Sequence, residues 1–507
     1  MTDTDARPDS ESTLPADDPA TLHRRLETML QRRAGAERLV SFERLSGGAS
    51  QETYRLVAVI DGVETPLALR RAPGGETGAV EGRPGLAVEA RLMIVAGEAG
   101  VPEPTVYAVL EPDDELGDGF VMEWLDGETL GARINRSAAH DGIRPSLAHE
   151  CGRILASIHA IDPKAPGLAD QLELKTPGAF LAEMVERYQL LGSPQPMIDF
   201  TAHWLADNLP EEQEPKLVHN DFRNGNIMVG PDGVMAVLDW EVAHLGDPMR
   251  DLGWICTNSW RFGQRNKPVG GFGDYADLFA GYEEVSGQPV DPDHVRFWEV
   301  FGSFWWAIGC LSMAERWRTG PDATVERPGI ARRSSECQVD CVNLLIPGPV
   351  EVVAPVDDPA ASSSTASSST DMPTTLELLV SVRDFLRTDV MPAIEGRTGF
   401  MARVASNSLD IVRRELELGP AHRRGELARL RDLLGLGEGD GPGAGHADDV
   451  PAALVELRRR LIAAMADGTI ARDDPALHHH LRTTVVNQVG IDQPVYSGYR
   501  AAVDQGV

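Results

Sequence analysis

The chain has 507 residues, of which 42% are hydrophobic, enough to fill the buried cores of about two to four domains. It carries 78 acidic and 47 basic residues, which gives a formal net charge of −31. Such a chain repels phosphate backbones, so binding to nucleic acid is not expected. Its five cysteines are an odd number scattered along a long chain, which indicates a reducing compartment rather than a disulfide framework.

No segment of the sequence predicts export or membrane insertion. The first residues, MTDTDARPDSESTLPADD, are acidic and lack the apolar stretch of a signal peptide. The most apolar stretch, residues 297–317, contains Glu299 and Glu315 and is too short between them to span a bilayer. We therefore expect a buried helix there, and a cytoplasmic protein that does not bind membranes.

Residues 217–253, LVHNDFRNGNIMVGPDGVMAVLDWEVAHLGDPMRDLG, are the most informative part of the chain. Two short apolar strands flank a Pro-Asp-Gly turn at residues 231–233, which predicts a hairpin. A hairpin folds back on itself, so Asn226 at its start and Asp239 at its end should be neighbours. Oxygen ligands of this kind suit Mg²⁺, and the carboxylate of Asp221 on the preceding loop suits phosphoryl transfer.

These residues resemble the catalytic core of the aminoglycoside phosphotransferase (choline kinase-like) family, which is related to the eukaryotic-type protein kinases. The HxDxxxxN pattern stands here as His219, Asp221 and Asn226, and Asp239 in LDWE corresponds to the metal-binding Asp of kinases. The resemblance implies that Asp221 is the catalytic base and that Asn226 and Asp239 bind Mg²⁺. Arg223 stands where a protein-kinase Lys touches the transferred phosphate, so it is a candidate catalytic residue.

Two features beside this core complete the resemblance. Asn220 stands where the family usually has Gly, a departure that leaves the acidic and amide ligands intact. Asp247 and Asp251 match the family's GDPxxDL stretch, and Asp251 is expected to accept hydrogen bonds from the backbone of the catalytic loop. The alternative, a solvated acidic loop beside a hairpin, is disfavoured by three functional positions at matching spacing.

A kinase-like unit also requires a small, strand-rich lobe that holds ATP. A strand runs into Gly47, Gly48, Ala49 and Ser50, whose small side chains let backbone amides approach a phosphate. Two glycines between strands are equally typical of an ordinary turn. The resemblance favours phosphate binding by Gly47, Gly48 and Ser50.

A cation is expected on the next strand, TPLALRRA, as Arg70 or Arg71. Strand alternation places Arg71 on the same face as Leu67 and Leu69, whereas alignment with the family, whose usual cation is Lys, favours Arg70 as the first choice. Glu89 lies in a predicted amphipathic helix and is the natural ion-pair partner of this cation. The alternative for Glu89 is an ordinary exposed glutamate.

The connection between the lobes is expected at MEWLDG, after two strands over roughly residues 105–111 and 119–124. In kinases the backbone of this hinge pairs with adenine, so Glu123 and Leu125 are the expected contacts. The following helix ends in His159, which we expect to be structural rather than catalytic.

The acceptor is less clearly encoded. Arg261, Arg265 and Lys267 form a cationic cluster after the catalytic unit, which favours an anionic acceptor such as a CoA phosphate; a solvated loop is equally consistent. The LSGGASQETYRL and VAVLDWEVAHLGDPMRDLGWI segments most resemble phosphotransferase domains fused to some acyl-CoA dehydrogenases, which implies a hydroxyacyl-CoA. The alternatives are an aminoglycoside or another small hydroxyl compound, or a non-catalytic nucleotide-binding scaffold.

We therefore expect an α+β fold, a bilobal protein-kinase-like unit with a β-rich N-lobe and a helical C-lobe, followed by a separate all-α domain. The predicted parts are a disordered acidic tail at 1–18, the N-lobe at 19–125, the C-lobe at 126–346, a flexible Pro/Ser/Asp-rich linker at 347–373, the helical domain at 374–492 and a tail at 493–507.

The C-terminal domain shows apolar residues at three- and four-residue intervals in five segments, residues 375–394, 399–418, 421–436, 450–468 and 475–490. It resembles an uncharacterised helical domain often encoded beside such phosphotransferases, and it is expected to dock on the kinase unit or mediate oligomerisation. His478, His479 and His480 point about 100° apart on a helix, so they are not expected to share a metal ion.

Overall fold

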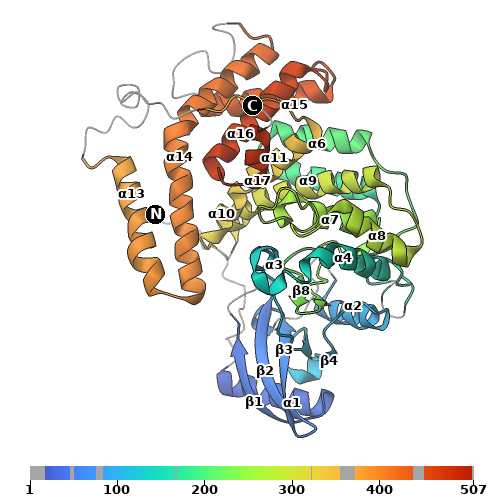
Figure 1. Cartoon of the computed structure of the whole chain (residues 1–507). Coiled ribbons are helices and arrows are strands. Elements are labelled where there is room, and N and C mark those ends of the chain that lie inside the picture. Colours follow the sequence, from blue (N-terminus) through green and yellow to red (C-terminus); the bar gives the residue numbers. More distant parts are fainter. Residues whose placement is uncertain are drawn as a thin grey trace, which may run out of the picture.

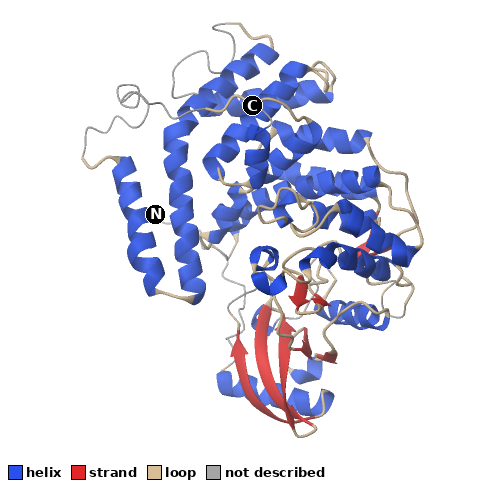
Figure 2. Ribbon diagram, viewed as in Figure 1, coloured by secondary structure: helices blue, strands red, loops and turns tan. Residues whose placement is uncertain are grey.

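The computed structural model describes residues 18–45, 51–75, 84–165, 168, 170–320, 323–353, 372–437 and 450–504. It has the predicted α+β architecture, in which a small sheet-containing lobe is joined to a helical lobe and further helices (Figure 1). Figure 2 shows that the long strands all belong to the small lobe. The predicted Gly47–Ser50 loop, residues 1–17 of the predicted tail and residues 354–371 of the predicted linker lie outside the described residues.

The N-lobe is built on an antiparallel sheet with the strand order β1-β2-β3-β5-β4. The strands are β1 (Ala36–Arg44), β2 (Glu52–Ile60), β3 (Val63–Arg71), β4 (Val106–Val109) and β5 (Gly119–Glu123). Helix α1 (Pro19–Arg33) begins with a hydrogen bond from Thr21 to the Asp18 side chain and covers one face of the sheet. Helix α2 (Leu86–Glu98) covers the opposite face, where it packs near Phe120.

This arrangement decides which of the two adjacent arginines faces the other lobe. Leu67 and Leu69 of β3 lie in the core formed with α1. Because side chains alternate along a strand, Arg71 shares their face and Arg70 points to the α2 face. The face that carries Leu67 and Leu69 is thus closed by α1, and the opposite face of β3 is turned toward the catalytic loop.

The C-lobe contains two small sheets and a set of helices. Its strands are β6 (Leu174–Lys175), β7 (Lys216–Val218), β8 (Ile227–Gly230), β9 (Gly233–Val237) and β10 (His244–Gly246). Its helices are α3 (Gly131–Arg136), α4 (Arg144–His159), α5 (Pro177–Leu190), α6 (Pro196–Asp207), α7 (Met249–Cys256), α8 (Tyr275–Ser286), α9 (Pro292–Thr319), α10 (Glu326–Arg332) and α11 (Ser334–Leu345), with the short 3-10 helix η4 (Asn258–Trp260) after α7.

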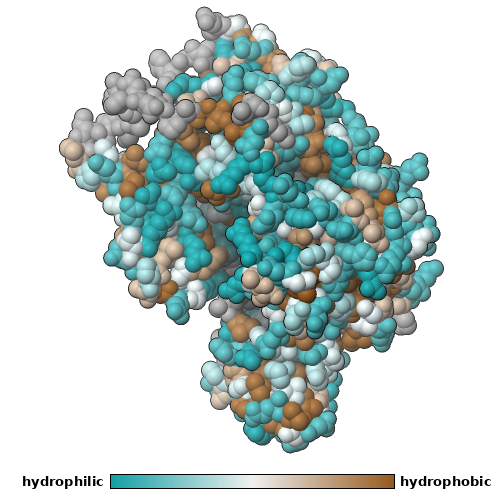
Figure 3. All heavy atoms as spheres, viewed as in Figure 1, coloured by the Kyte–Doolittle hydropathy of each residue, from teal (hydrophilic) through white to brown (hydrophobic). Residues whose placement is uncertain are grey.

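Helix α9 contains the apolar stretch that was predicted to be a buried helix. Trp298, Phe301 and Phe304 are almost completely buried in the C-lobe core, which confirms that prediction. None of the described helices has both the length and the apolar character that crossing a bilayer requires. On the face drawn in Figure 3, hydrophilic atoms predominate, in keeping with the many charged residues.

Helices α4 and α8 approach each other closely because two glycines lie at their contact. A Cβ atom at Gly281 would overlap the backbone carbonyl oxygen of His149, and one at Gly152 would overlap that of Leu278. The close approach lets the Tyr282 hydroxyl lie 3.0 Å from Nδ1 of His159. The packing of these two helices therefore fixes His159, which faces the catalytic loop.

The C-terminal helices are α13 (Thr375–Phe385), α14 (Gly396–Leu433), α15 (Val450–Ala466), α16 (Pro475–Asp492) and α17 (Ser497–Asp504). Two helices expected on either side of Pro420 are one continuous helix, α14. An ion pair between Glu415 and Arg423 spans the proline, which lacks a backbone donor. The stretch expected to be a tail, 493–507, includes α17.

One apolar core is shared by the C-lobe and the C-terminal helices. It joins Met197 and Phe200 of α6 and Val339 of α11 to Leu457 of α15 and Leu481 of α16. Ion pairs at its edges link Arg332 to Asp492 and Arg472 to Asp207. The two parts are thus in direct contact in this structure.

The three consecutive histidines of α16 have different surroundings. The ring of His478 donates a hydrogen bond to the Arg472 carbonyl and packs edge-on to Phe200. His480 is buried, and burial first of all lowers its pKa, to about 3, against the opposing effect of Glu426. The three histidine side chains thus point in different directions, as the geometry of a helix dictates.

Replacement of Gly281 by Ala should destabilise the protein, because the new methyl group must push α4 and α8 apart. We expect a loss of about 1–3 kcal/mol in the free energy of unfolding, the usual effect of overpacking. Gly142→Ala is the matched control, because a Cβ atom there has no neighbour within 4 Å. Thermal unfolding of both variants checks this, and equal midpoints would contradict the tight α4–α8 contact.

Candidate active site

The β8–β9 hairpin has the predicted form and brings two chain segments together. Ile227 pairs with Val237, and the Leu238 amide donates to the Asn226 carbonyl at 2.7 Å. Asn226 and Asp239 therefore flank the same open end of the hairpin, as the sequence predicted. Asp239 has φ 70°, a left-handed conformation that is unusual outside glycine and is often found at functional sites.

The Asp221 carboxylate is held by three side chains. Arg223 donates to both oxygens, with its Nε 2.9 Å from Oδ1 and its Nη2 3.1 Å from Oδ2. The Asn226 amide nitrogen donates to Oδ2 at 2.6 Å, and Trp254 Nε1 donates to Oδ1 at 2.9 Å. The site therefore unites Asp221, Arg223 and Asn226, and it directs the amide oxygen of Asn226 away from Asp221.

The backbone of this loop is shaped by Asp251 of α7. Its two carboxylate oxygens accept hydrogen bonds from the backbone amides of His219, at 2.8 Å, and Asn220, at 2.7 Å. This confirms the predicted role of Asp251. Asn220 has φ 65°, which explains why Asn replaces the usual Gly, since Asn is the residue that best tolerates this region after Gly.

The Asp251 carboxylate stays charged although it is completely buried. Burial alone would raise its pKa, but the hydrogen bond from His159 and the backbone amide of His219 hold that pKa below its usual range. His159 Nε2 lies 3.1 Å from Oδ2, so His159 is the structural residue that was predicted.

Arg70 links the two lobes by ion pairs. Its guanidinium lies 2.7 Å from the Glu89 carboxylate of α2 and 2.9 Å from the Asp239 carboxylate. The predicted Arg70–Glu89 pair is therefore present. Burial raises the pKa of Glu89 to about 7 in spite of the Arg70 charge, whereas Arg70 holds the pKa of Asp239 below its usual range against the effect of burial.

Arg71 has a separate set of partners on the other face of the sheet. Its Nε donates to Glu52 at 2.9 Å, and its guanidinium lies over the Tyr54 ring. It is almost fully buried there. The structure thus brings Arg70, and not Arg71, to the catalytic loop.

The predicted hinge follows β5, which ends at Glu123. The Glu123 amide donates to the Thr105 carbonyl at 2.8 Å, and Trp124 donates to Pro66 at 3.3 Å, so Leu125 is the first residue beyond these sheet contacts. Glu123 and Leu125 are half-buried at the joint of the lobes. Whether their backbone contacts a base stays a prediction.

Sequence reasoning missed the aromatic residues beside Asp221. Trp254 packs against Trp260, with ring centroids 5.1 Å apart, and the Arg223 guanidinium lies 4.2 Å from the Trp260 ring centroid. A signal was available: Trp254 follows Asp251 by three residues in a helix, so both side chains face the same way. Since Asp251 was expected to face the catalytic loop, Trp254 should have been expected there too.

Each member of the cationic cluster predicted for the acceptor has an acidic partner. Arg261 pairs with Glu299, Arg265 with Asp504 and Lys267 with Asp274. These pairs offset the charge of the cluster, and its contact with an anionic acceptor stays a prediction. The composition of the short stretch that holds these three residues could not reveal acidic partners that lie elsewhere in the sequence.

A cavity lies directly beside the catalytic loop. It has a volume of about 500 Å³ and reaches Asn220, the residue before Asp221. Three cationic side chains line it, namely Lys175, Arg187 and Arg316, together with the Trp305 ring. Glu173 and Glu183 also line it and pair with Lys175.

The lobes, the hairpin and the Asp221 network form a kinase-like unit. Residues 41–287 match the model of the phosphotransferase enzyme family, so this region of the chain is similar to that family. Residues 392–496 match a domain of unknown function, DUF6285. Residues between these two ranges, which include α9, α10 and α11, are covered by neither model.

The chain is also similar to curated relatives and to a solved structure. The chain is 30% identical over 221 residues to acyl-CoA dehydrogenase family member 10 of Mus musculus, which covers 41% of the chain and 19% of that protein. It is 33% identical over 165 residues to family member 11 of Gallus gallus, which covers 30% of the chain and 20% of that protein. The matches thus span about a fifth of the length of these relatives.

Among solved structures, a protein assigned as an aminoglycoside phosphotransferase from Ralstonia eutropha is 25% identical, with a TM-score of 0.50. The match covers 62% of this chain and 95% of that one. The similar part is therefore the kinase-like unit, without the C-terminal helices.

Replacement of Asp251 by Asn should weaken the fold around the catalytic loop. We expect a loss of about 3 kcal/mol at pH 7, because two backbone amides lose a charged acceptor. The pKa of Asp251 is lowered on folding, so its contribution is present above about pH 4 and is lost as the pH falls through the folded pKa. Urea unfolding of wild type and variant from pH 3 to pH 8 should show a difference that shrinks only on the acid side. A difference that is constant with pH would contradict the buried ionised carboxylate.

Proposed function

We propose that this protein transfers the γ-phosphoryl group of ATP, with Mg²⁺, to the hydroxyl group of a small molecule, and that the acceptor is a hydroxyacyl-CoA. The observation that carries the proposal is the Asp221 carboxylate, fixed by Arg223, Asn226 and Trp254 in a family of phosphotransferases. The Arg70–Asp239 pair lies across the joint of the lobes, where the phosphates of ATP would enter.

The residues fit the proposed reaction step by step. Asp221 accepts the proton of the acceptor hydroxyl as the new O–P bond forms and the bond between the γ-phosphorus and the bridging oxygen of ATP breaks, which releases ADP. Arg223 lies beside Asp221 and can meet the charge on the transferred group. Arg70 would contact the phosphates of ATP, and Glu89 orients it.

Asn226 and Asp239 suit a hard cation. The two residues share one end of the hairpin, one with an amide oxygen and one with a carboxylate, the donor types that Mg²⁺ prefers. Among the described residues no group of three or more His, Cys, Asp or Glu is placed to hold a metal ion, so the phosphates and water would complete the shell. When bound, Mg²⁺ would neutralise phosphate charge during transfer.

The cavity beside Asn220 supports an anionic acceptor. Arg187 is an exposed cation at its wall, Arg316 lies there with a partner of its own, and Lys175 is held at its side by Glu173 and Glu183. The names of the curated relatives, acyl-CoA dehydrogenase family members 10 and 11, point to a CoA-linked compound. A hydroxyacyl-CoA combines a hydroxyl for transfer with phosphates for these cations.

An acceptor screen tests the proposal directly. Purified protein with ATP and Mg²⁺ should add one phosphoryl group to a hydroxyacyl-CoA, measured by mass spectrometry, and should act poorly on the free hydroxy acid and on aminoglycosides. Asp221→Asn should lower turnover by about 10²–10⁴-fold, because the general base is lost. Phosphorylation of aminoglycosides alone would overturn the acceptor, and nucleotide binding without transfer to any acceptor would identify a scaffold.

Arg70 and Arg71 offer a matched pair of substitutions. Arg70→Met should raise the KM for ATP at least tenfold, because a phosphate contact is lost. Arg71→Met should leave that KM unchanged and lower the free energy of unfolding by about 2 kcal/mol, because Glu52 loses a charged hydrogen-bond donor. Steady-state kinetics and thermal unfolding of both variants check this; the opposite pattern would show that Arg71 faces the nucleotide.

A further inference from the structure

The last helices of the chain meet the C-lobe close to the active site. Residue Tyr496 is the final position of the DUF6285 match, and α17 follows it directly. Both lie against α11, as the adjoining ribbons in Figure 1 indicate. A Cβ atom at Gly498 would come within 2.5 Å of the Asp340 carboxylate and 2.8 Å of the Tyr496 ring, so the contact is tight.

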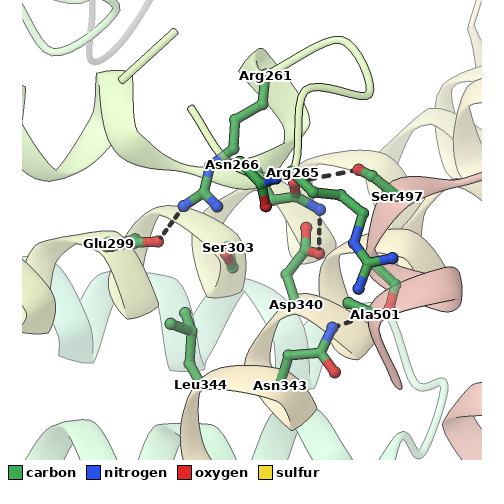
Figure 4. A pocket seen from close by; sticks show the side chains of 12 residues that line it. Arg261, Arg265, Asn266, Glu299, Ser303, Asp340, Asn343, Leu344, Ser497 and Ala501 are labelled. Carbon is green, nitrogen blue, oxygen red and sulfur yellow. Dashed lines mark hydrogen bonds and ion pairs between the residues drawn. The ribbon is translucent and has the colours of Figure 1, made fainter. Parts of the chain in front are cut away.

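A buried carboxylate at this contact joins the two parts of the chain. Asp340 of α11 accepts hydrogen bonds from the Tyr496 hydroxyl, at 2.6 Å, and from the Asn258 side chain, at 2.7 Å. The Ser497 hydroxyl lies 3.2 Å from the Asn258 amide oxygen and donates to it. Figure 4 shows that Asp340 and Ser497 both line the cavity at this joint.

A cavity lies at the same joint, beside the apolar core that α11 and α17 share. The cavity in Figure 4 has a volume of about 220 Å³ and is lined by residues of both η4 and α17. Polar groups such as Asn266 and Asn343 line it. Directed hydrogen bonds centred on Asp340 therefore contribute to the position of η4 relative to α17.

From Asn258 the contacts lead into the catalytic loop. Asn258 begins η4, and Trp260 ends it. The Trp260 carbonyl accepts a hydrogen bond from the Asn224 side chain at 3.2 Å, and the Trp260 ring lies under the Arg223 guanidinium. Arg223 in turn donates two hydrogen bonds to Asp221.

We propose that the C-terminal helical domain positions the catalytic loop. Through Asp340, Tyr496 fixes Asn258 and with it the Trp260 ring that supports Arg223 against Asp221. Tyr496, Asp340 and Asn258 are positioning residues, since none of them touches the reacting atoms. The inference rests on the proposed function, in which Asp221 is the base.

A contact that only holds the two parts of the chain together would not need a buried carboxylate. A carboxylate that is 97% buried by its surroundings is a costly way to join two helices, and an apolar contact would hold them at least as firmly. Burial raises the pKa of Asp340 to about 7, and the hydrogen bonds from Tyr496 and Asn258 oppose that rise. Hydrogen bonds, unlike apolar contacts, depend on the orientation of their donors and acceptors. The hydrogen bonds of Asp340 can therefore fix the orientation of Asn258.

Tyr496→Phe removes one hydroxyl and tests the inference in the full-length protein. We expect kcat to fall on the order of tenfold or more, as for other small displacements of catalytic groups, while the KM for ATP stays unchanged. Tyr499→Phe is the matched control, because Tyr499 lies on α17 and its hydroxyl has no hydrogen-bond partner among the described residues. Asn258→Ala should lower kcat likewise, and the double variant should lose less than the product of the two single losses.

Hydrogen exchange of the peptide that spans residues 217–226 provides a measurement independent of turnover. Exchange should be faster in Tyr496→Phe and Asn258→Ala than in wild type and Tyr499→Phe, while all four proteins keep their unfolding midpoints within a few degrees. If wild type transfers no phosphoryl group, the proposed function fails and exchange still decides the positioning role. Unchanged kcat and exchange in Tyr496→Phe, or equal changes in Tyr499→Phe, would overturn the inference.

Discussion

The catalytic loop keeps its shape because one buried carboxylate accepts hydrogen bonds from its backbone. Asp251 binds the amides of His219 and Asn220, and the whole C-lobe is arranged to present it. Helix α4 supplies His159 as a donor, α8 supplies the Tyr282 hydroxyl that orients His159, and the Gly152–Gly281 contact brings the two helices together. A loop with two left-handed residues nearby needs such external support, since the backbone itself does not favour that shape.

The features that could be predicted from the sequence are those that depend on residues close together in the chain. The β8–β9 hairpin, the roles of Asp251 and His159 and the helical C-terminal region could all be predicted, because a turn, a short motif and a helical period are readable over few residues. Arg70 and Arg71 show the limit: alternation correctly separated their faces, but only the position of α1 reveals which face of the sheet is closed. A rule about one strand contains no information on what covers it.

Other features could not be read from local sequence for the same reason. Arg261, Arg265 and Lys267 are basic neighbours in sequence, yet each has an acidic partner that the folded chain brings to it. Pro420 ends helices by local preference, yet α14 continues across it, and Glu415 in the turn before it pairs with Arg332 and Arg423. The predicted phosphate loop at Gly47–Ser50 lies outside the described residues.

The choice of arginine at position 70 also determines which chemical labels can report on the site. A guanidinium stays protonated throughout the physiological range and is a poor nucleophile, in contrast to the lysine amine usual in this family. Acylating reagents that target amines therefore have no reactive group at this position, whereas dicarbonyl reagents that condense with guanidinium groups do. Its half-buried ion pairs with Glu89 and Asp239 would slow that condensation, so the rate of labelling measures how often the two lobes separate.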